Sequence, residues 1–135
     1  MDPTSWDQVE TLHGMVTQRL AKEVQRRHGI GLSEYQALCR LARADDGELR
    51  MQELAELIGL NQSSVSRLAA RLESAGLTRR DLCPKDRRGV YTVITDKGRA
   101  LRDQAEPTYR EALADAMAEA SADARVSDLV TKLRP

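Results

Sequence analysis

Residues 62–75 combine small polar and basic side chains in a pattern that could read a nucleic acid. A helix turns about 100° per residue, which would gather the apolar side chains of this segment on one stripe and the polar ones opposite. The apolar stripe contains Val65, Leu68, Ala69 and Leu72, and the polar stripe contains Ser63, Ser66, Arg67, Ala70 and Ser74. Serine hydroxyls bond to base edges in a major groove, and arginine bonds guanine at two atoms. An ordinary solvated helix face is the alternative reading of this pattern. The DNA-reading face is favoured when the pattern is combined with the basic loop and the local charge described below.

Gln62 and Arg71 extend this candidate contact surface beyond the polar stripe. Gln62 and Ser63 lie at the N-terminus of the predicted helix, where backbone N–H groups suit a phosphate. Arg71 lies at the edge of the polar stripe. Two readings stay open for Arg71, because it could bind a phosphate or pair with a neighbouring carboxylate.

A short basic loop follows in the sequence. Residues 85–89 read Lys-Asp-Arg-Arg-Gly and place Arg87 and Arg88 beside a turn. A narrow minor groove concentrates negative potential and attracts guanidinium groups. We therefore expect these arginines to contact DNA, with Asp86 holding one of them in place. The alternative is a solvated turn whose charges only keep the hairpin soluble.

The charge of the chain is balanced overall but unevenly distributed. The 21 basic and 21 acidic residues cancel. Residues 62–99 carry 9 basic and 4 acidic side chains, whereas residues 1–61 carry 7 and 10, and residues 100–135 carry 5 and 7. The positive excess therefore coincides with the candidate DNA-reading helix and the loop after it, as expected for a nucleic-acid contact.

The spacing of apolar residues predicts the elements that position these side chains. Apolar positions recur every three or four residues from Trp6 to Val24, which predicts a first helix capped by Asp2 or Thr4. It ends at Gly29, since glycine can adopt the left-handed conformation that closes a helix. Ser33 begins a capping-box pattern for a second helix.

A helix-turn-helix is predicted next. A third helix covers about Met51 to Ile58, although Arg50 stands where a good capping residue is expected. The tight turn Gly59-Leu60-Asn61 leads to a fourth helix from Gln62 to about Ala75, with Asn61 as a favourable cap.

The periodicity then changes from helical to alternating. Val90 to Ile94 is rich in β-branched residues, so residues 77–95 predict a β-hairpin. Thr95 is expected to cap a long helix that Pro107 bends, and Ser121 to cap a last short helix.

Helix, turn, helix and hairpin in this order indicate a winged helix-turn-helix. The predicted fold class is mainly α with a small β-hairpin wing, in a single domain over residues 1–135.

These segments resemble the MarR (multiple antibiotic resistance regulator) family. The resemblance spans about residues 33–100. It rests on Leu54-Ala55, Gly59 to Leu68, Arg71 to Glu73, Gly76-Leu77, Arg79, Asp86-Arg87-Arg88 and Ile94 to Gly98. The helix-turn-helix part is common to many regulators, whereas Asp-Arg-Arg followed by Thr-x-x-Gly is more specific.

The resemblance implies a sequence-specific transcription regulator that binds duplex DNA as a homodimer. Residues 33–98 would form the DNA-binding lobe, and residues 4–28 and 99–134 the dimerisation helices. Each recognition helix would enter a major groove and each wing a minor groove of a pseudo-palindromic operator. The resemblance also implies a repressor released by a small aromatic or phenolic effector, or by thiol oxidation.

Effectors of the family bind between the dimerisation helices and the DNA-binding lobe, which makes His13, Tyr35 and Arg40 candidate pocket residues. The alternative for His13 is a partly buried helix residue. The chain has no Phe, one Trp and three Tyr, so a broad stacking pocket is not indicated.

The two cysteines suggest neither a zinc site nor a disulfide, because Cys39 and Cys83 form no CxxC motif and no histidine lies at metal spacing. Cys39 is expected to be a small apolar core residue. Cys83 stands beside Lys85 and is a candidate for oxidation, with a passive loop thiol as the alternative. We expect no metal and no cofactor.

The sequence offers little support for membrane proteins, enzymes or protein-binding modules. No leader pattern or membrane-spanning run is present, so we expect a soluble cytoplasmic chain. Nucleotide-binding glycine motifs and HExxH are absent, and only two histidines occur, so we expect no enzyme. A winged helix that contacts protein instead of DNA is the remaining alternative, but an acidic or apolar recognition face would favour it.

Overall fold

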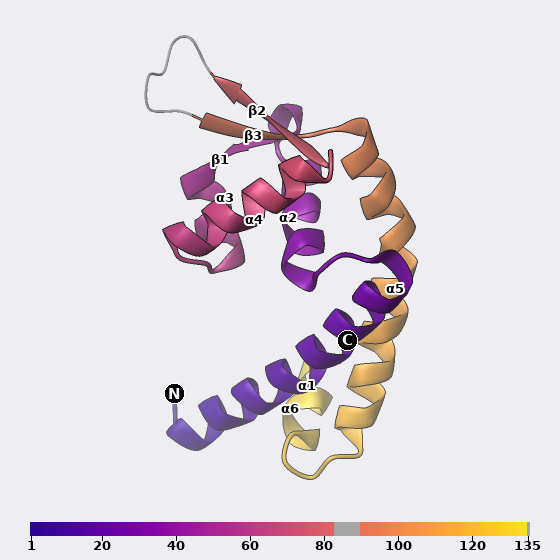
Figure 1. The fold of residues 1–135 in the computed structure, drawn as a ribbon. Helices are drawn as coiled ribbons and strands as arrows, with labels where there is room; N and C mark the ends of the chain where they lie inside the picture. Colours follow the sequence, from indigo (N-terminus) through magenta and orange to yellow (C-terminus); the bar gives the residue numbers. More distant parts are fainter. Residues whose placement is uncertain (83–89, 135) are drawn as a thin grey trace. The chain divides into compact units, whose positions relative to one another are not determined.

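The computed structural model describes residues 1–82 and 90–134 (Figure 1). In chain order the elements are α1 Pro3–His28, α2 Leu32–Arg43, η1 Asp45–Gly47, β1 Glu48–Arg50, α3 Met51–Ile58, α4 Gln62–Ser74, β2 Thr78–Leu82, β3 Val90–Ile94, α5 Asp96–Ser121 and α6 Ser127–Leu133. They group into two compact units, Ser33–Ala105 and Met1–Leu32 with Glu106–Pro135. Among the described helices, none combines the length and hydrophobicity that a membrane span needs.

The Ser33–Ala105 unit is built on leucines. The side chains of Leu38 and Leu41 on α2, Leu54 on α3, and Leu68 and Leu72 on α4 are fully buried. Each such side chain contributes about 1.5–3 kcal/mol when it leaves water. The predicted helix-turn-helix is present as α3 and α4, and the two strands of the predicted hairpin are present as β2 and β3.

The sheet has one strand more than the sequence predicts. β3 lies between β1 and β2, and both pairings are antiparallel. Thr92 on β3 is opposite Leu49 on one side and Arg80 on the other. β1 is only three residues long, so it carries no alternating pattern of its own, and its pairing with β3 defines it as a strand.

Side-chain caps and a glycine set the predicted boundaries of α1 and α3. The Asp2 side chain accepts a hydrogen bond from Thr4 N, and Gly29 ends α1 with φ 71°. α3 begins at Met51 although the Arg50 side chain makes no capping hydrogen bond. Instead, Glu53 Oε1 accepts from Arg50 N at 3.0 Å. This is the return half of a capping box, so Glu53 compensates for the poor cap.

Two predicted caps are wrong. α2 begins at Leu32, so Ser33 lies inside its first turn. Ser121 belongs to the end of α5, and its hydroxyl donates to Ala118 O at 2.7 Å. α6 begins only at Ser127, because a turn at Asp123 precedes it.

The segment after β3 fixes the C-terminal end of α4. Thr95 Oγ1 accepts from Gly98 N at 3.1 Å, as predicted for the cap of α5, and donates to Gly76 O at 2.7 Å. Lys97 Nζ donates to Ala75 O at 2.7 Å, where a cation suits the negative end of a helix. A Cβ on Gly98 would lie 2.2 Å from Leu77 O. Only glycine therefore allows this close approach.

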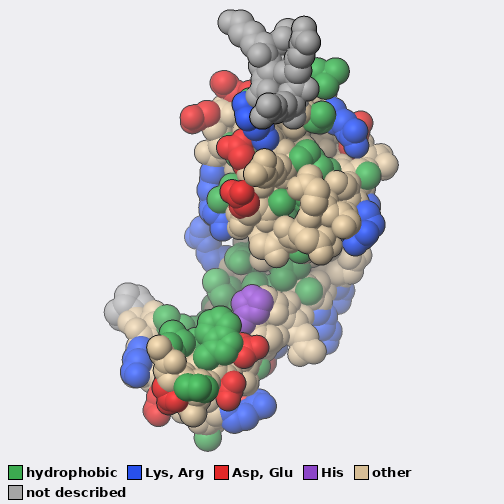
Figure 2. Space-filling model, turned by 90° about the vertical axis from the view of Figure 1, so that its left-hand side faces the viewer, with side chains coloured by type: hydrophobic (Ala, Val, Ile, Leu, Met, Phe, Trp, Pro, Cys, Tyr) green, Lys and Arg blue, Asp and Glu red, His purple; other side chains and the backbone are tan. Residues whose placement is uncertain are grey.

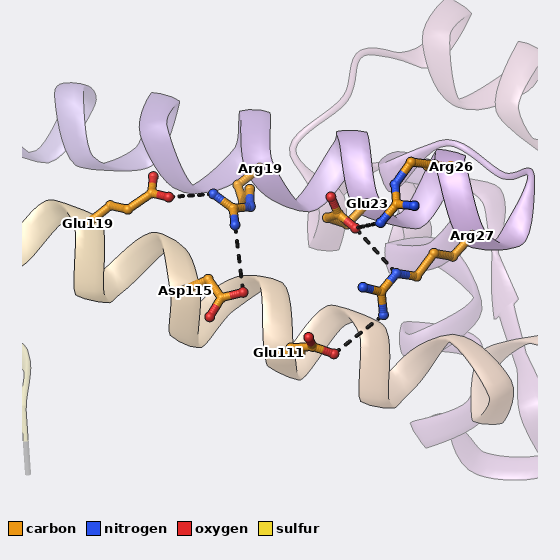
Figure 3. A network of polar contacts seen from close by, with 7 residues as sticks. All are labelled: Arg19, Glu23, Arg26, Arg27, Glu111, Asp115 and Glu119. Atoms are coloured by element: carbon orange, nitrogen blue, oxygen red, sulfur yellow. Dashed lines mark hydrogen bonds and ion pairs between the residues drawn. The ribbon is translucent and has the colours of Figure 1, made fainter.

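The other unit has a smaller apolar core and a charged rim. Leu12, Ala120, Val126 and Val130 form a buried cluster, against which Met15, Val16, Met117 and Leu129 pack. Figure 3 shows the rim, where Arg19 pairs with Asp115 and Glu119, and Arg27 pairs with Glu23 and Glu111.

Two ion pairs of this rim shift pKa values. The hydrogen bond that Arg26 donates to Glu23 lowers the pKa of Glu23, and the hydrogen bond that Arg19 donates to Glu119 raises the pKa of Arg19. Such exposed pairs stabilise a fold weakly.

Asp123 closes the turn between α5 and α6. Its carboxylate accepts hydrogen bonds from the Arg125 guanidinium at 2.7 and 3.0 Å and from the Arg125 backbone N–H at 2.9 Å. These bonds favour the ionised form and lower the pKa of Asp123 to about 2.

We predict that Gly98→Ala lowers the free energy of unfolding by at least about 2 kcal/mol, because the new methyl group would clash with the Leu77 carbonyl. Gly14→Ala is the matched control. Nothing lies within 4 Å of a Cβ at Gly14, so this change should stabilise α1 by about 0.5–1 kcal/mol. Urea unfolding measures both. Equal effects of the two substitutions would contradict the close packing at Gly98.

We predict that Asp123→Asn removes a pH-dependent part of the stability. The folded pKa is about 2 and the reference value is 3.8, so the contribution is present above about pH 4 and is lost as pH falls toward 2. Urea unfolding of both proteins between pH 7 and 2 should therefore show a stability difference that shrinks with acid. Arg125→Ala should reproduce this loss, and a difference that is constant with pH would refute the assignment.

Candidate nucleic-acid interface

α4 presents the two stripes that the sequence predicts. Val65, Leu68, Ala69 and Leu72 are buried, whereas Ser63, Ser66, Arg67, Ala70 and Ser74 are exposed. Figure 2 views the molecule from the left-hand side of Figure 1, where the α3–α4 turn lies. There it shows backbone and side chains that are neither charged nor hydrophobic gathered on one face, with basic side chains on both flanks. The exposed stripe of α4 is thus small, polar and available to a partner.

The N-terminus of α4 is capped by its own sequence. Asn61 Oδ1 accepts from Ser64 N at 2.9 Å, and Asn61 has the extended backbone of a capping residue. Gln62 and Ser63 follow in the first turn and are exposed. Their side chains and the positive end of the helix dipole therefore face the same solvent region.

The two arginines of α4 have different partners. Arg67 Nη2 donates to Ser64 Oγ at 3.4 Å, one turn earlier on the same face. Arg71 Nε donates to Glu34 Oε1 on α2 at 3.3 Å. Of the two readings open for Arg71, the structure contains the carboxylate pair. Sequence reasoning did not find Glu34, because 37 positions separate it from Arg71.

β2 carries two more exposed arginines, each beside a carboxylate. Arg79 Nη1 lies 3.7 Å from Asp81 Oδ2 on the same strand. Arg80 Nε donates to Glu73 Oε2, at the end of α4, at 2.8 Å. The positive block of the sequence is therefore partly neutralised within the fold.

The predicted wing contacts Arg87 and Arg88, their support Asp86, and Cys83 lie outside the described residues. The flanking strands β2 and β3 pair from Thr78↔Ile94 to Leu82↔Val90. In the sequence, residues 83–89 connect these two paired strands.

The candidate effector residues lie in different environments. His13 is exposed on α1, Tyr35 on α2 is only 3% exposed, and Arg40 is exposed on the same helix. His13 therefore does not match the partly buried alternative. Cys39 is half-buried, less than a full core residue.

Two of the surface cavities that the described residues form each lie within one unit. One of about 450 Å³ is lined by Arg50, Gln52, Glu53, Glu56 and Tyr91. The other, of about 240 Å³, is lined by Arg19, Glu23, Arg26, Arg27, Thr108, Glu111, Ala112 and Asp115. Neither is lined by His13, Tyr35 or Arg40.

Comparison with known proteins identifies the family. The family model described as MarR family matches residues 28–89. Sco3205, a MarR family transcriptional regulator from Streptomyces coelicolor solved in complex with DNA, is 31% identical, with a TM-score of 0.77 over 83% of this chain and 70% of Sco3205. The chain belongs to the MarR family.

Two other proteins agree with this assignment to the MarR family. The uncharacterized HTH-type transcriptional regulator YkoM of Bacillus subtilis is 30% identical over 98 residues, or 73% of this chain. The match spans 62% of the length of YkoM. CouR from Rhodococcus jostii RHA1, solved bound to p-coumaroyl-CoA, is 30% identical, with a TM-score of 0.69 over 77% of this chain and 71% of CouR. The winged helix-turn-helix fold predicted from the sequence is confirmed by these comparisons.

We predict that Asn61→Ala destabilises this MarR-family chain by about 1 kcal/mol, because Ser64 N loses its capping acceptor. Asn61→Ser should keep most of the stability, since serine is also a good cap. Thermal unfolding followed by circular dichroism provides the comparison. If the alanine and serine variants melt together, the Asn61 cap does not stabilise α4.

Proposed function

We propose that this chain is a sequence-specific transcription regulator that binds duplex DNA through α4. The exposed stripe of α4 carries the proposal, because small hydroxyl side chains allow close approach to base edges. In a helix-turn-helix the N-terminal residues of the second helix contact base edges. Sco3205, which is 31% identical to this chain and was solved in complex with DNA, supports DNA as the partner.

In this proposal the contact residues divide by role. Gln62, Ser63, Ser66 and Arg67 face the major groove, and Arg67 bonds a guanine. Arg71 lies further along α4, where its guanidinium would contact the phosphate backbone once it leaves Glu34. Arg87 and Arg88 would contact the minor groove, supported by Asp86.

We also propose that the chain acts as a homodimer on a pseudo-palindromic operator. Two large apolar side chains in the Met1–Leu32 and Glu106–Pro135 unit support this. Trp6 is 53% exposed and Leu133 is 58% exposed. Exposed apolar side chains of this size suit burial by a second copy. Residues 4–28 and 99–134 would then supply the dimerisation helices.

We also propose that the chain is a repressor and that a small aromatic or phenolic effector releases it from its operator. The support comes from CouR, which is 30% identical to this chain and was solved with p-coumaroyl-CoA bound. A compound of that class should lower the affinity of this chain for its operator.

Fluorescence anisotropy tests DNA binding. The purified chain is titrated onto the duplex immediately upstream of its own gene and onto random duplex, across a salt series. We expect tighter binding to the upstream duplex, weakening steeply with salt. Weak and equal binding to both duplexes at all salts would contradict this proposal for that duplex and favour a protein-binding winged helix.

We predict that Arg67→Ala costs about 1–3 kcal/mol on the preferred duplex and relaxes the preference at one base pair, because one guanine contact is lost. Arg110→Ala removes the same charge in the other unit, where Arg110 pairs with Glu106, and serves as the control. Anisotropy on single-base-pair variants of the duplex gives the preference. An equal loss on all sequences would show that Arg67 does not read a base.

We predict that Leu133→Asp converts the homodimer to a monomer, because it places a charge in the proposed apolar interface. Leu57→Asp makes the same change at another exposed leucine, on α3, and should leave the dimer intact. Sedimentation velocity distinguishes the species. A pattern identical to that of the wild type would exclude Leu133 from the interface.

A further inference from the structure

The arginines of α4 and β2 are not equivalent. Arg71, Arg79 and Arg80 each lie beside a carboxylate, at distances of 3.3, 3.7 and 2.8 Å. Within residues 1–82 and 90–134, Arg67 contacts the Ser64 hydroxyl and no carboxylate. The fold thus leaves one guanidinium of this group without an acidic partner and neutralises the other three.

The carboxylate that holds Arg71 is the most buried of the three. The side chain of Glu34 is 21% exposed, compared with 45% for Glu73 and 52% for Asp81. Glu34 also lies in the first turn of α2, where the helix dipole stabilises a negative charge. Its position is therefore fixed by α2, whereas the Arg71 side chain is 55% exposed and extends from α4.

The position of Arg71 along α4 limits what it can contact on DNA. It follows Arg67 by one helical turn, about 6 Å further from the N-terminal end that meets base edges. A phosphate of the backbone is the DNA group that suits it there. If Arg71 moved from Glu34 to a phosphate, the Glu34 carboxylate would be left unpaired beside the negatively charged DNA. Leaving this charge unpaired is unfavourable.

We propose that Glu34 restrains Arg71 and so weakens sequence-independent binding of this chain to DNA. The inference rests on the proposed DNA-binding function. Glu34 is a positioning residue in this account, because it acts through Arg71 and contacts no DNA itself. Arg67, which has no such restraint, keeps its full charge for the duplex.

A double-mutant cycle tests the restraint. Affinity for a labelled random-sequence duplex is measured for the wild type, Glu34→Gln, Arg71→Ala and the double variant, between roughly 50 and 200 mM salt. Glu34→Gln should raise the affinity severalfold, and the salt slope should steepen by about 0.9, the value of one added phosphate contact. In the Arg71→Ala background, Glu34→Gln should leave the slope unchanged and the affinity nearly so.

Glu34→Asp separates the restraint from the charge alone. It keeps the carboxylate but shortens its reach by one methylene, so the bond to Arg71 weakens without a change in net charge. The restraint predicts a rise in random-duplex affinity smaller than that of Glu34→Gln. If Glu34→Asp binds as the wild type does, the charge of Glu34 acts alone and the proposal fails.

Glu23→Gln is the matched control, because it removes a carboxylate paired with two arginines in the other unit. It should not change affinity, and circular dichroism melting verifies that every variant is folded. Equal gains from Glu34→Gln with and without Arg71 would overturn the proposal, as would no gain in the wild-type background. Absence of DNA binding by the wild type would instead refute the proposed function.

Discussion

Burial of the apolar stripe of α4 is the constraint on which the candidate interface depends. Val65, Leu68 and Leu72 are each 0% exposed. Turning the helix by one residue would move it about 100° and carry polar side chains toward the core, where unpaired polar groups are costly. The serines and Arg67 therefore face outward because the core requires the opposite stripe. The ends of α4 are held as firmly, by Asn61 at one end and by Thr95 and Lys97 at the other.

Ion pairs within the fold reduce the positive charge of this surface. The sequence shows a positive block over residues 62–99, but Glu34, Glu73 and Asp81 pair with three of its arginines. Charge counted along the sequence therefore overstates the charge that the described residues offer to a phosphate. Serine hydroxyls, the capped end of α4 and Arg67 remain as the groups that distinguish this face from an ordinary basic surface.

Local signals predicted most of the Ser33–Ala105 unit. The bounds of α3 and the start of α4 follow from Gly59 and Asn61, which act on neighbouring residues and can be read directly from the sequence. β1 was missed because a three-residue strand is defined by its partner β3. The Ser121 cap was wrong because packing prolongs α5 to that residue, and the Asp123 turn then precedes α6.

The candidate site, too, is predictable from the sequence only in part. Which residues of α4 are exposed follows from periodicity, so the polar stripe was predictable. Which of them pair with carboxylates depends on contacts between distant elements, such as Arg71 with Glu34 across 37 positions. No local pattern contains that information, and only the fold, which brings Glu34 on α2 within 3.3 Å of Arg71 on α4, provides it.

Amide hydrogen exchange with and without the bound duplex tests the central claim most directly. The account predicts that DNA protects the first turns of α4, from Gln62 to Arg67, because these residues would lie in the groove. Protection confined to α1, α6 and the second half of α5, with none on α4, would contradict the claim that α4 is the DNA-binding surface.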